Sequence, residues 1–137
     1  MSLQQSERPM LLHNNENPLG PGAKVIASMN RGLEGGRGGR YPGGVDVGGT
    51  IARVQGIPSE HVMLGNGSTQ LLRTCTHVWT SPTKALVTAS PTFEECTDYA
   101  KNIGHAVEES GLDENLALDL DEMAAAAKGA GMVFLNN

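Results

Sequence analysis

The chain has 137 residues, 39% of them hydrophobic, and a formal net charge of −5. This length and apolar fraction are those of one ordinary domain that can bury a core, and the acidic balance argues against nucleic acid as the main partner. No apolar run reaches the ~20 residues that span a bilayer, and residues 1–10 lack the hydrophobic region of a signal peptide, so we expect a cytoplasmic protein without membrane contact.

The N-terminal segment is predicted to be irregular. Residues 1–10 are polar and expected to be frayed. Residues 11–21 contain two prolines and three asparagines, which exclude a regular helix or strand. Polar amides beside leucines suit a loop that lines a substrate, yet asparagine-rich turns are also common for purely structural reasons. Both interpretations of this loop stay open on the sequence alone.

Two helices are predicted next. Apolar side chains recur at helical spacing over residues 22–33 and predict one amphipathic helix. The glycine-rich residues 35–39 then predict a flexible connection. Residues 45–54 predict a weak helix, because Gly48 and Gly49 each cost about 1 kcal/mol relative to alanine. Between the two helices, Tyr41 is an isolated loop aromatic, which usually packs but could offer its hydroxyl to a ligand.

From residue 62 onward, predicted strands alternate with predicted helices. Apolar runs predict strands at residues 62–64, 84–89, 105–108 and 132–135, and helical spacing predicts helices at residues 69–79, 93–103 and 120–128. This alternation predicts an α/β fold whose mostly parallel sheet has helices on both faces. We expect Cys75 and Cys96 to be small core residues, because two distant cysteines form neither a disulfide framework nor a metal site.

The sequence Gly-Asn-Gly-Ser-Thr at residues 65–69 lies between a predicted strand and a predicted helix. Glycines at such a turn let the backbone approach a ligand, and the first helix N–H groups point outward, which favours a phosphate site. The alternative is a tight turn in which Ser68 merely caps the helix. A dinucleotide fingerprint would need glycine at Gln70, and a nucleoside-triphosphate loop would need Gly-Lys-Ser/Thr, so neither motif is met.

The chain stops at the end of the predicted fourth strand, and no helix follows. A sheet that ended there would leave an exposed edge, which favours association or poor solubility. We therefore expect the sequence to be the N-terminal part of a longer protein.

Four motifs in order carry a resemblance to a known family. They are Asn-Glu-Asn-Pro-Leu-Gly-Pro at residues 15–21, Arg-Tyr-Pro-Gly at residues 40–43, Gly-Asn-Gly-Ser-Thr at residues 65–69 and Ser-Pro-Thr-Phe at residues 90–93. Together they resemble the fold-type-I pyridoxal-phosphate aminotransferases, in the branch of histidinol-phosphate aminotransferase. The resemblance implies an aspartate-aminotransferase-like large domain beginning at residue 41. It also implies that residues 1–40 form an arm and helix of the smaller domain or the interdomain region.

The resemblance assigns roles around the cofactor, pyridoxal 5′-phosphate. Gly67, Ser68 and Thr69 would hold its phosphate through backbone N–H groups and hydroxyls. Phe93 would stack on its pyridine ring, where many relatives carry tyrosine. The chain would therefore supply part of a cofactor site and no metal site.

The N-terminal motifs receive roles from the same resemblance. Tyr41 would reach across a homodimer interface to the cofactor phosphate of the partner subunit. Asn15, Glu16 and Asn17 would line the substrate pocket. The glycine-rich segments around Tyr41 are looser than the usual helix-turn of the family, which is a departure from its pattern.

The resemblance also implies that no catalytic residue lies within these 137 residues. The Schiff-base lysine and the family's other cofactor and substrate ligands would follow residue 137, and none of the four lysines is placed to replace that lysine: Lys24, Lys84, Lys101 and Lys128. The complete protein would move an amino group between an amino acid or amino-alcohol phosphate, similar to histidinol phosphate, and a 2-oxo acid. A decarboxylase of a phosphorylated amino acid and a non-catalytic fragment are the alternatives, and the isolated chain is expected to be inactive.

Overall fold

The structure is a computed structural model that describes residues 14–41 and 44–136. The chain divides into two compact units, Met1–Val45 and Asp46–Asn137. The predictions for residues 1–13 and for Pro42 and Gly43 lie outside the described residues. No helix in the described ranges is long and apolar enough to cross a bilayer.

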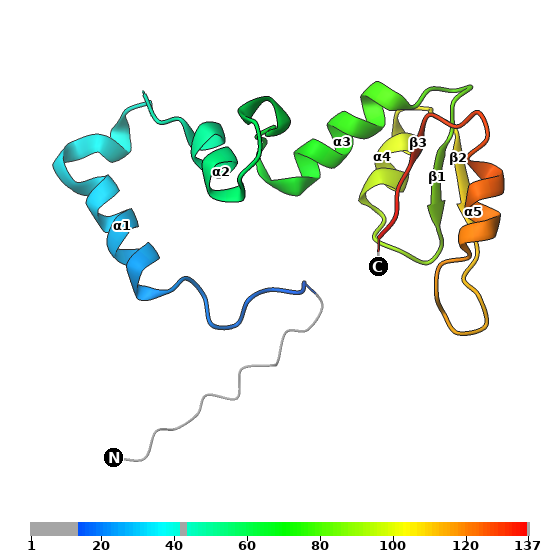
Figure 1. Ribbon diagram of the computed structural model, residues 1–137, viewed down its shortest axis with the longest axis horizontal. Helices are drawn as coiled ribbons and strands as arrows, with labels where there is room; N and C mark the ends of the chain where they lie inside the picture. The colour runs from blue at the N-terminus through cyan, green and yellow to red at the C-terminus, as the bar shows by residue number, and fades with distance from the viewer. Residues whose placement is uncertain (1–13, 42–43, 137) are drawn as a thin grey trace, which may run out of the picture. The chain divides into compact units, whose positions relative to one another are not determined.

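The described part of the first unit contains the α-helix α1 at Ala23–Leu33, which confirms the helix predicted from apolar spacing (Figure 1). The glycine-rich stretch that follows was expected to be a flexible connection, but it forms the 3₁₀ helix η1 at Glu34–Gly39. Short 3₁₀ turns commonly extend the end of an α-helix. The apolar face of α1 contains no buried residue, and Met29 and Leu33 are exposed.

The second unit begins with α2 at Val47–Gln55, the helix predicted to be weak. Its ends explain why it forms despite its glycines. The Asp46 carboxylate accepts a hydrogen bond from the Gly49 amide at 2.8 Å, and Gly56 ends the helix in the left-handed conformation with φ +67°. Caps of this kind satisfy backbone groups that a helix end leaves unpaired, and this offsets the cost of the internal glycines.

The strand predicted at residues 62–64 is wrong. The 3₁₀ helix η2 at Ser59–His61 precedes this segment, and Val62 has extended dihedral angles, but the segment pairs with no strand among the described residues. Met63 and Leu64 are both exposed. An apolar triplet becomes a strand only where a neighbouring strand accepts its backbone hydrogen bonds, and in the part of the chain that the structure describes none lies beside it.

The α/β prediction is confirmed for the rest of the second unit (Figure 1). Three parallel strands form a sheet in the order β2-β1-β3, and three helices accompany them. In the register of the sheet, Leu86 on the central strand is paired with Val107 on one neighbouring strand and with Met132 on the other. The strands are β1 at Leu86–Ala89, β2 at Val107–Ser110 and β3 at Met132–Val133, and the helices are α3 at Gly67–Trp79, α4 at Glu95–Asn102 and α5 at Leu120–Ala126.

Alternate residues of β1 pack against helices on opposite faces of the sheet, as the period of a strand requires. Leu86 is fully buried against Cys96 and Ala100 of α4, with Leu72 of α3 beside them. Val87 and Ala89 point the other way and pack against Met123 of α5. Helices therefore cover both faces, as predicted.

Cys96 is a core residue, which confirms the expectation for this cysteine, whereas Cys75 is only half-buried. Burial raises the pKa of the Cys96 thiol above its ordinary value, although a hydrogen bond with Thr76 opposes this effect. A buried, protonated thiol is unreactive, so the role of the Cys96 side chain is to pack in the core.

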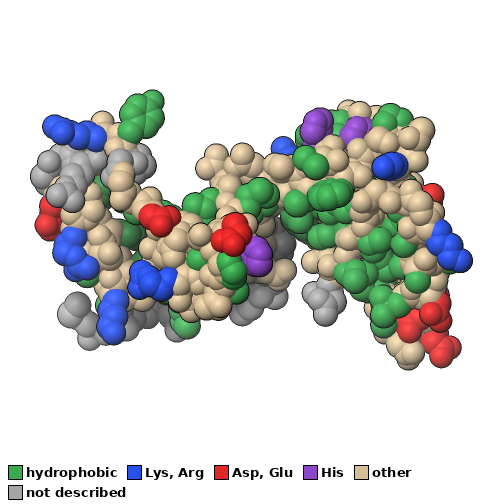
Figure 2. All heavy atoms as spheres, turned by 45° about the horizontal axis from the view of Figure 1, so that its top comes forward, with side chains coloured by type: hydrophobic (Ala, Val, Ile, Leu, Met, Phe, Trp, Pro, Cys, Tyr) green, Lys and Arg blue, Asp and Glu red, His purple; other side chains and the backbone are tan. Residues whose placement is uncertain are grey.

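Apolar side chains also lie on the surface of the second unit, where they appear green in Figure 2. Val78 and Trp79 at the end of α3 are both more than half exposed, and so is Leu120 at the start of α5. Only contacts beyond this unit would cover these side chains.

Candidate functional site

Helices α3 and α4 run in the same direction, which brings their N-termini to one edge of the sheet. Two contacts show this direction: Arg73 of α3 binds Glu95 at the start of α4, and Thr80 at the end of α3 bonds with His105, which follows the end of α4. Because α4 follows β1 directly, its N-terminus lies at the carboxyl end of that strand. The start of α3 and the turn before α4 therefore share the edge where parallel sheets bind ligands.

The two glycines of the 65–69 motif are favoured for different reasons. Gly67 has φ +74°, a left-handed conformation that favours glycine, and no atom lies within 4 Å of the place where a Cβ would stand. A Cβ on Gly65 would come within 2.9 Å of the Leu71 side chain. The first glycine therefore lets the turn pack on its own helix, and the second leaves open space in front of the helix start.

The backbone amides of Asn66 and Gly67 already have hydrogen-bond acceptors within the turn and the first turn of α3. The Gly67 N–H donates to the Gly65 carbonyl oxygen at 2.9 Å, and the Asn66 N–H donates to Gln70 Oε1 at 2.6 Å. These bonds fix the entry of the chain into α3. The family resemblance implied that the Gly67 amide binds the cofactor phosphate, but in this conformation the amide donates its hydrogen bond within the turn.

The amides of Ser68 and Thr69 lie in the first turn of α3 and find no acceptor among the described residues. Ser68 is not the cap, because Asn66 holds that position and makes no side-chain cap bond. Both residues are exposed, and the first turn contains no acidic side chain. Two N–H groups and two hydroxyls at the positive end of a helix dipole fit a phosphate group.

Phe93 lies in the turn between β1 and α4, and half of its surface is exposed. The same turn is tied to the segment after β3, since Asn136 Nδ2 donates to Thr92 Oγ1 at 3.4 Å. An exposed ring at the carboxyl edge of the sheet is free to offer a flat apolar face to a planar ligand.

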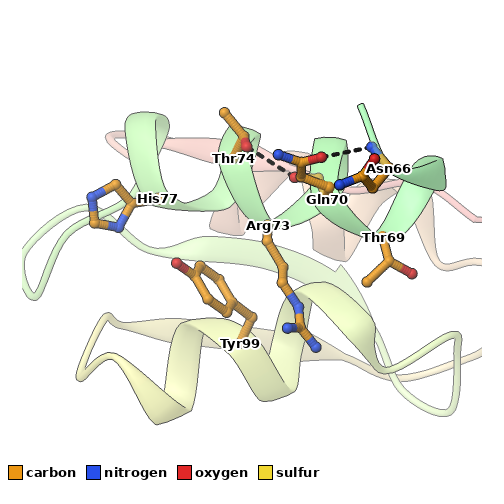
Figure 3. A pocket seen from close by; sticks show the side chains of 7 residues that line it. All are labelled: Asn66, Thr69, Gln70, Arg73, Thr74, His77 and Tyr99. Atoms are coloured by element: carbon orange, nitrogen blue, oxygen red, sulfur yellow. Dashed lines mark hydrogen bonds between the residues drawn. The ribbon is translucent and has the colours of Figure 1, made fainter. Parts of the chain in front are cut away.

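A surface groove of about 390 Å³ runs between α3 and α4 (Figure 3). Thr69 is the one predicted site residue that lines it, whereas Gly67, Ser68 and Phe93 do not. The structure thus brings the predicted cofactor residues of the second unit, Gly67, Ser68, Thr69 and Phe93, to one edge of the sheet without enclosing them in one pocket. The groove is lined by Asn66, Thr69, Gln70, Arg73, Thr74, His77 and Tyr99.

Arg73 and Tyr99 were not found by sequence reasoning. Arg73 Nε of α3 bonds to Glu95 Oε1 of α4, and the guanidinium carbon lies 5.6 Å from the centre of the Tyr99 ring. Helical spacing could have placed Arg73 on the outer face of α3, but no local pattern indicates its partners 22 and 26 residues away.

The remaining predicted residues belong to the first unit. Tyr41 is fully exposed, and Asn15 and Glu16 are exposed. Asn17 closes its own turn, because its Oδ1 accepts from the Leu19 amide at 3.1 Å and its Nδ2 donates to the Gly20 carbonyl at 3.2 Å. This gives Asn17 a structural role, while the roles of all four residues toward substrate or a partner's cofactor stay predictions.

Curated relatives match most of this chain but only part of their own length. Histidinol-phosphate aminotransferase 1 of Mesorhizobium japonicum is 31% identical over 117 residues, which cover 85% of this chain and 32% of that protein. Histidinol-phosphate aminotransferase of Symbiobacterium thermophilum is 31% identical over 127 residues, which cover 90% of this chain and 34% of that protein. The chain thus spans about a third of the length of these relatives. No protein-family model matches it.

Solved structures give the same picture. The crystal structure of a candidate histidinol-phosphate aminotransferase from Erwinia carotovora atroseptica matches 88% of this chain and 35% of its own, with a TM-score of 0.77 and 25% identity. An aminotransferase candidate from Burkholderia pseudomallei matches 82% of this chain and 34% of its own, with a TM-score of 0.70 and 25% identity.

Proposed function

We propose that this chain, which is aminotransferase-like and has the fold-type-I arrangement, forms the phosphate-binding part of a pyridoxal-phosphate-dependent transaminase. The observation that carries the proposal is the start of α3, where Ser68 and Thr69 present amides and hydroxyls at the positive end of a helix. The substrates would be an amino acid or an amino-alcohol phosphate similar to histidinol phosphate, together with a 2-oxo acid. The names of the curated relatives support this choice.

Each residue would have a defined task. Ser68 and Thr69 would bind the cofactor phosphate, Gly67 would leave room for it, and Phe93 would orient the pyridine ring by stacking. When bound, the cofactor supplies an electron sink for the bond changes at the amino carbon. The chain's own residues would therefore bind and orient, and the lysine that bonds the cofactor would come from sequence outside these 137 residues.

The remaining assignments complete the proposal. Tyr41 would contact the cofactor phosphate of the partner in a cytoplasmic homodimer, and Asn15, Glu16 and Asn17 would line the substrate pocket. Residues 1–40 would belong to the smaller domain or the interdomain region, and residues 41–137 to the large domain. These assignments rest on the motifs at residues 15–21 and 40–43.

The test of this function is an amino-transfer assay on the protein expressed over its complete reading frame. Purified protein is incubated with pyridoxal phosphate, histidinol phosphate and 2-oxoglutarate, and the new amino acid is quantified. We expect amino transfer. Release of carbon dioxide from a phosphorylated amino acid without transfer would indicate the decarboxylase instead, and absence of both reactions would contradict an enzyme of this class.

Replacing Phe93 with alanine should weaken cofactor binding by about 1 kcal/mol, or roughly fivefold, because a stacked ring contributes about that much beyond its buried area. Phe93→Tyr is the matched control, since it keeps the ring and should keep the affinity. The dissociation constant of pyridoxal phosphate, measured by equilibrium dialysis, checks both variants. Unchanged affinity in Phe93→Ala would reduce Phe93 to an ordinary surface residue.

A further inference from the structure

We propose that Arg73 is a positioning residue that fixes the phosphate-binding turn relative to the Phe93 ring. The inference rests on the proposed cofactor site, because it concerns how two halves of that site are held together. One half, Ser68 and Thr69, begins α3, and the other half, Phe93, precedes α4 by two residues.

Arg73 links the two helices close to both halves. It lies five residues after Ser68 on α3, and its Nε bonds to the Oε1 of Glu95, the first residue of α4. Its guanidinium also lies over the Tyr99 ring, one turn further along α4. Figure 3 shows the Arg73 and Tyr99 side chains between the two helices. Glu95 is the more buried partner, with 19% of its side chain exposed against 52% for Arg73.

The start of α3 has few other contacts that could fix its position relative to α4. The only fully buried residue of α3 is Thr76, which lies in the second half of the helix. Leu72 is partly buried against Leu86, Cys96 and Ala100, but residues 66–70 are all exposed. Among the described residues, Arg73 makes the side-chain hydrogen bond between α3 and α4 that lies nearest to the phosphate-binding turn.

The chemistry of arginine suits this role. A guanidinium is planar and always charged, so it can bond to a carboxylate along its edge while an aromatic ring covers its face. A lysine at the same place would keep the charge but lose the planar stacking and the fixed direction of the bond. Ion pairs at the surface contribute little to global stability, so the effect of Arg73 should appear in the geometry of the site and not in unfolding.

The test compares Arg73→Met with Lys101→Met in the protein expressed over its complete reading frame. Lys101 is a matched control, because its side chain is also 52% exposed and its Nζ bonds to Glu109 Oε2 at 3.1 Å. This ion pair links α4 to β2, whereas the Arg73 ion pair links α3 to α4. For each variant, the dissociation constant of pyridoxal phosphate and the thermal unfolding midpoint are measured. Arg73→Lys serves as the conservative variant.

We expect Arg73→Met to weaken pyridoxal phosphate binding by about fivefold to tenfold, because small displacements of positioned groups are costly. Arg73→Lys should lose part of this affinity, and Lys101→Met should stay within about twofold of the unchanged protein. Both methionine variants should have similar unfolding midpoints. Equal affinities in the two methionine variants, or a much lower midpoint in Arg73→Met alone, would overturn the positioning role. If the unchanged protein itself fails to bind the cofactor, the proposed function fails first, and the inference fails with it.

Discussion

Replacing Ser68 with aspartate should abolish cofactor retention without weakening the fold. A carboxylate in the first turn of α3 would lie beside the proposed phosphate position, and repulsion between like charges about 4 Å apart is worth several kcal/mol near a protein surface. We expect the dissociation constant of pyridoxal phosphate to rise at least about 100-fold, which corresponds to roughly 3 kcal/mol. The same carboxylate should stabilise α3 by about 0.3–1 kcal/mol, because its first turn has no acidic residue.

The opposite signs of these two effects make the variant informative. Ser68→Asn removes the hydroxyl without adding charge and should lose much less affinity. Thr74→Asp places a carboxylate on an exposed position of the same helix, further from its start, and should retain most of the binding. Retained cofactor in Ser68→Asp, with affinity equal to that of Ser68→Asn, would mean that the phosphate binds elsewhere.

Replacing Gly131 with alanine should destabilise the second unit by about 3 kcal/mol, at the upper end for inserting a methyl group into a closely packed site. A Cβ on Gly131 would lie 2.0 Å from the carbonyl oxygen of Trp79 and 2.9 Å from its carbonyl carbon. Both groups are backbone, so neither can rotate away. The Gly131 amide also donates to the Ala85 carbonyl at 2.9 Å, and a shift of the chain would break this bond at the start of β3.

Gly111→Ala is the control for this prediction. A Cβ at Gly111 would meet only Glu122 Oε2, at 4.0 Å. We expect a change within about 0.5 kcal/mol for this surface position. Urea unfolding followed by circular dichroism measures both variants. If Gly131→Ala is as stable as Gly111→Ala, then β3 does not approach α3 as closely as the structure describes.

The fold of residues 67–136 was largely predictable because apolar periodicity there changes regularly between strand and helix. The sequence placed α3, α4 and α5 with end positions that differ by only a few residues. Strand ends were less predictable, since pairing decides them. β3 covers Met132–Val133 although the apolar run continues through Leu135. The same reason explains residues 62–64, which have a strand-like composition but pair with no strand in the described ranges 14–41 and 44–136.

The candidate site was predictable only where a local motif carries it. Gly67 and Ser68 are adjacent in sequence, so a turn and a helix start could be inferred together. The use of the Gly67 amide within its own turn depends on backbone conformation and could not be inferred. Arg73, Glu95 and Tyr99 meet only because α3 and α4 pack side by side, and one sequence contains no signal for that contact.

The most direct test of the phosphate site compares pyridoxal phosphate with pyridoxal, which is the same molecule without its phosphate. Their dissociation constants are measured by equilibrium dialysis on the protein expressed over its complete reading frame. If Ser68 and Thr69 bind the phosphate, pyridoxal phosphate should bind at least about 100-fold more tightly, since charge-assisted hydrogen bonds are the strong ones, and Ser68→Asp should remove most of that preference. Equal affinity for the two molecules, or a preference that Ser68→Asp leaves intact, would contradict the assignment of the α3 start as the cofactor phosphate site.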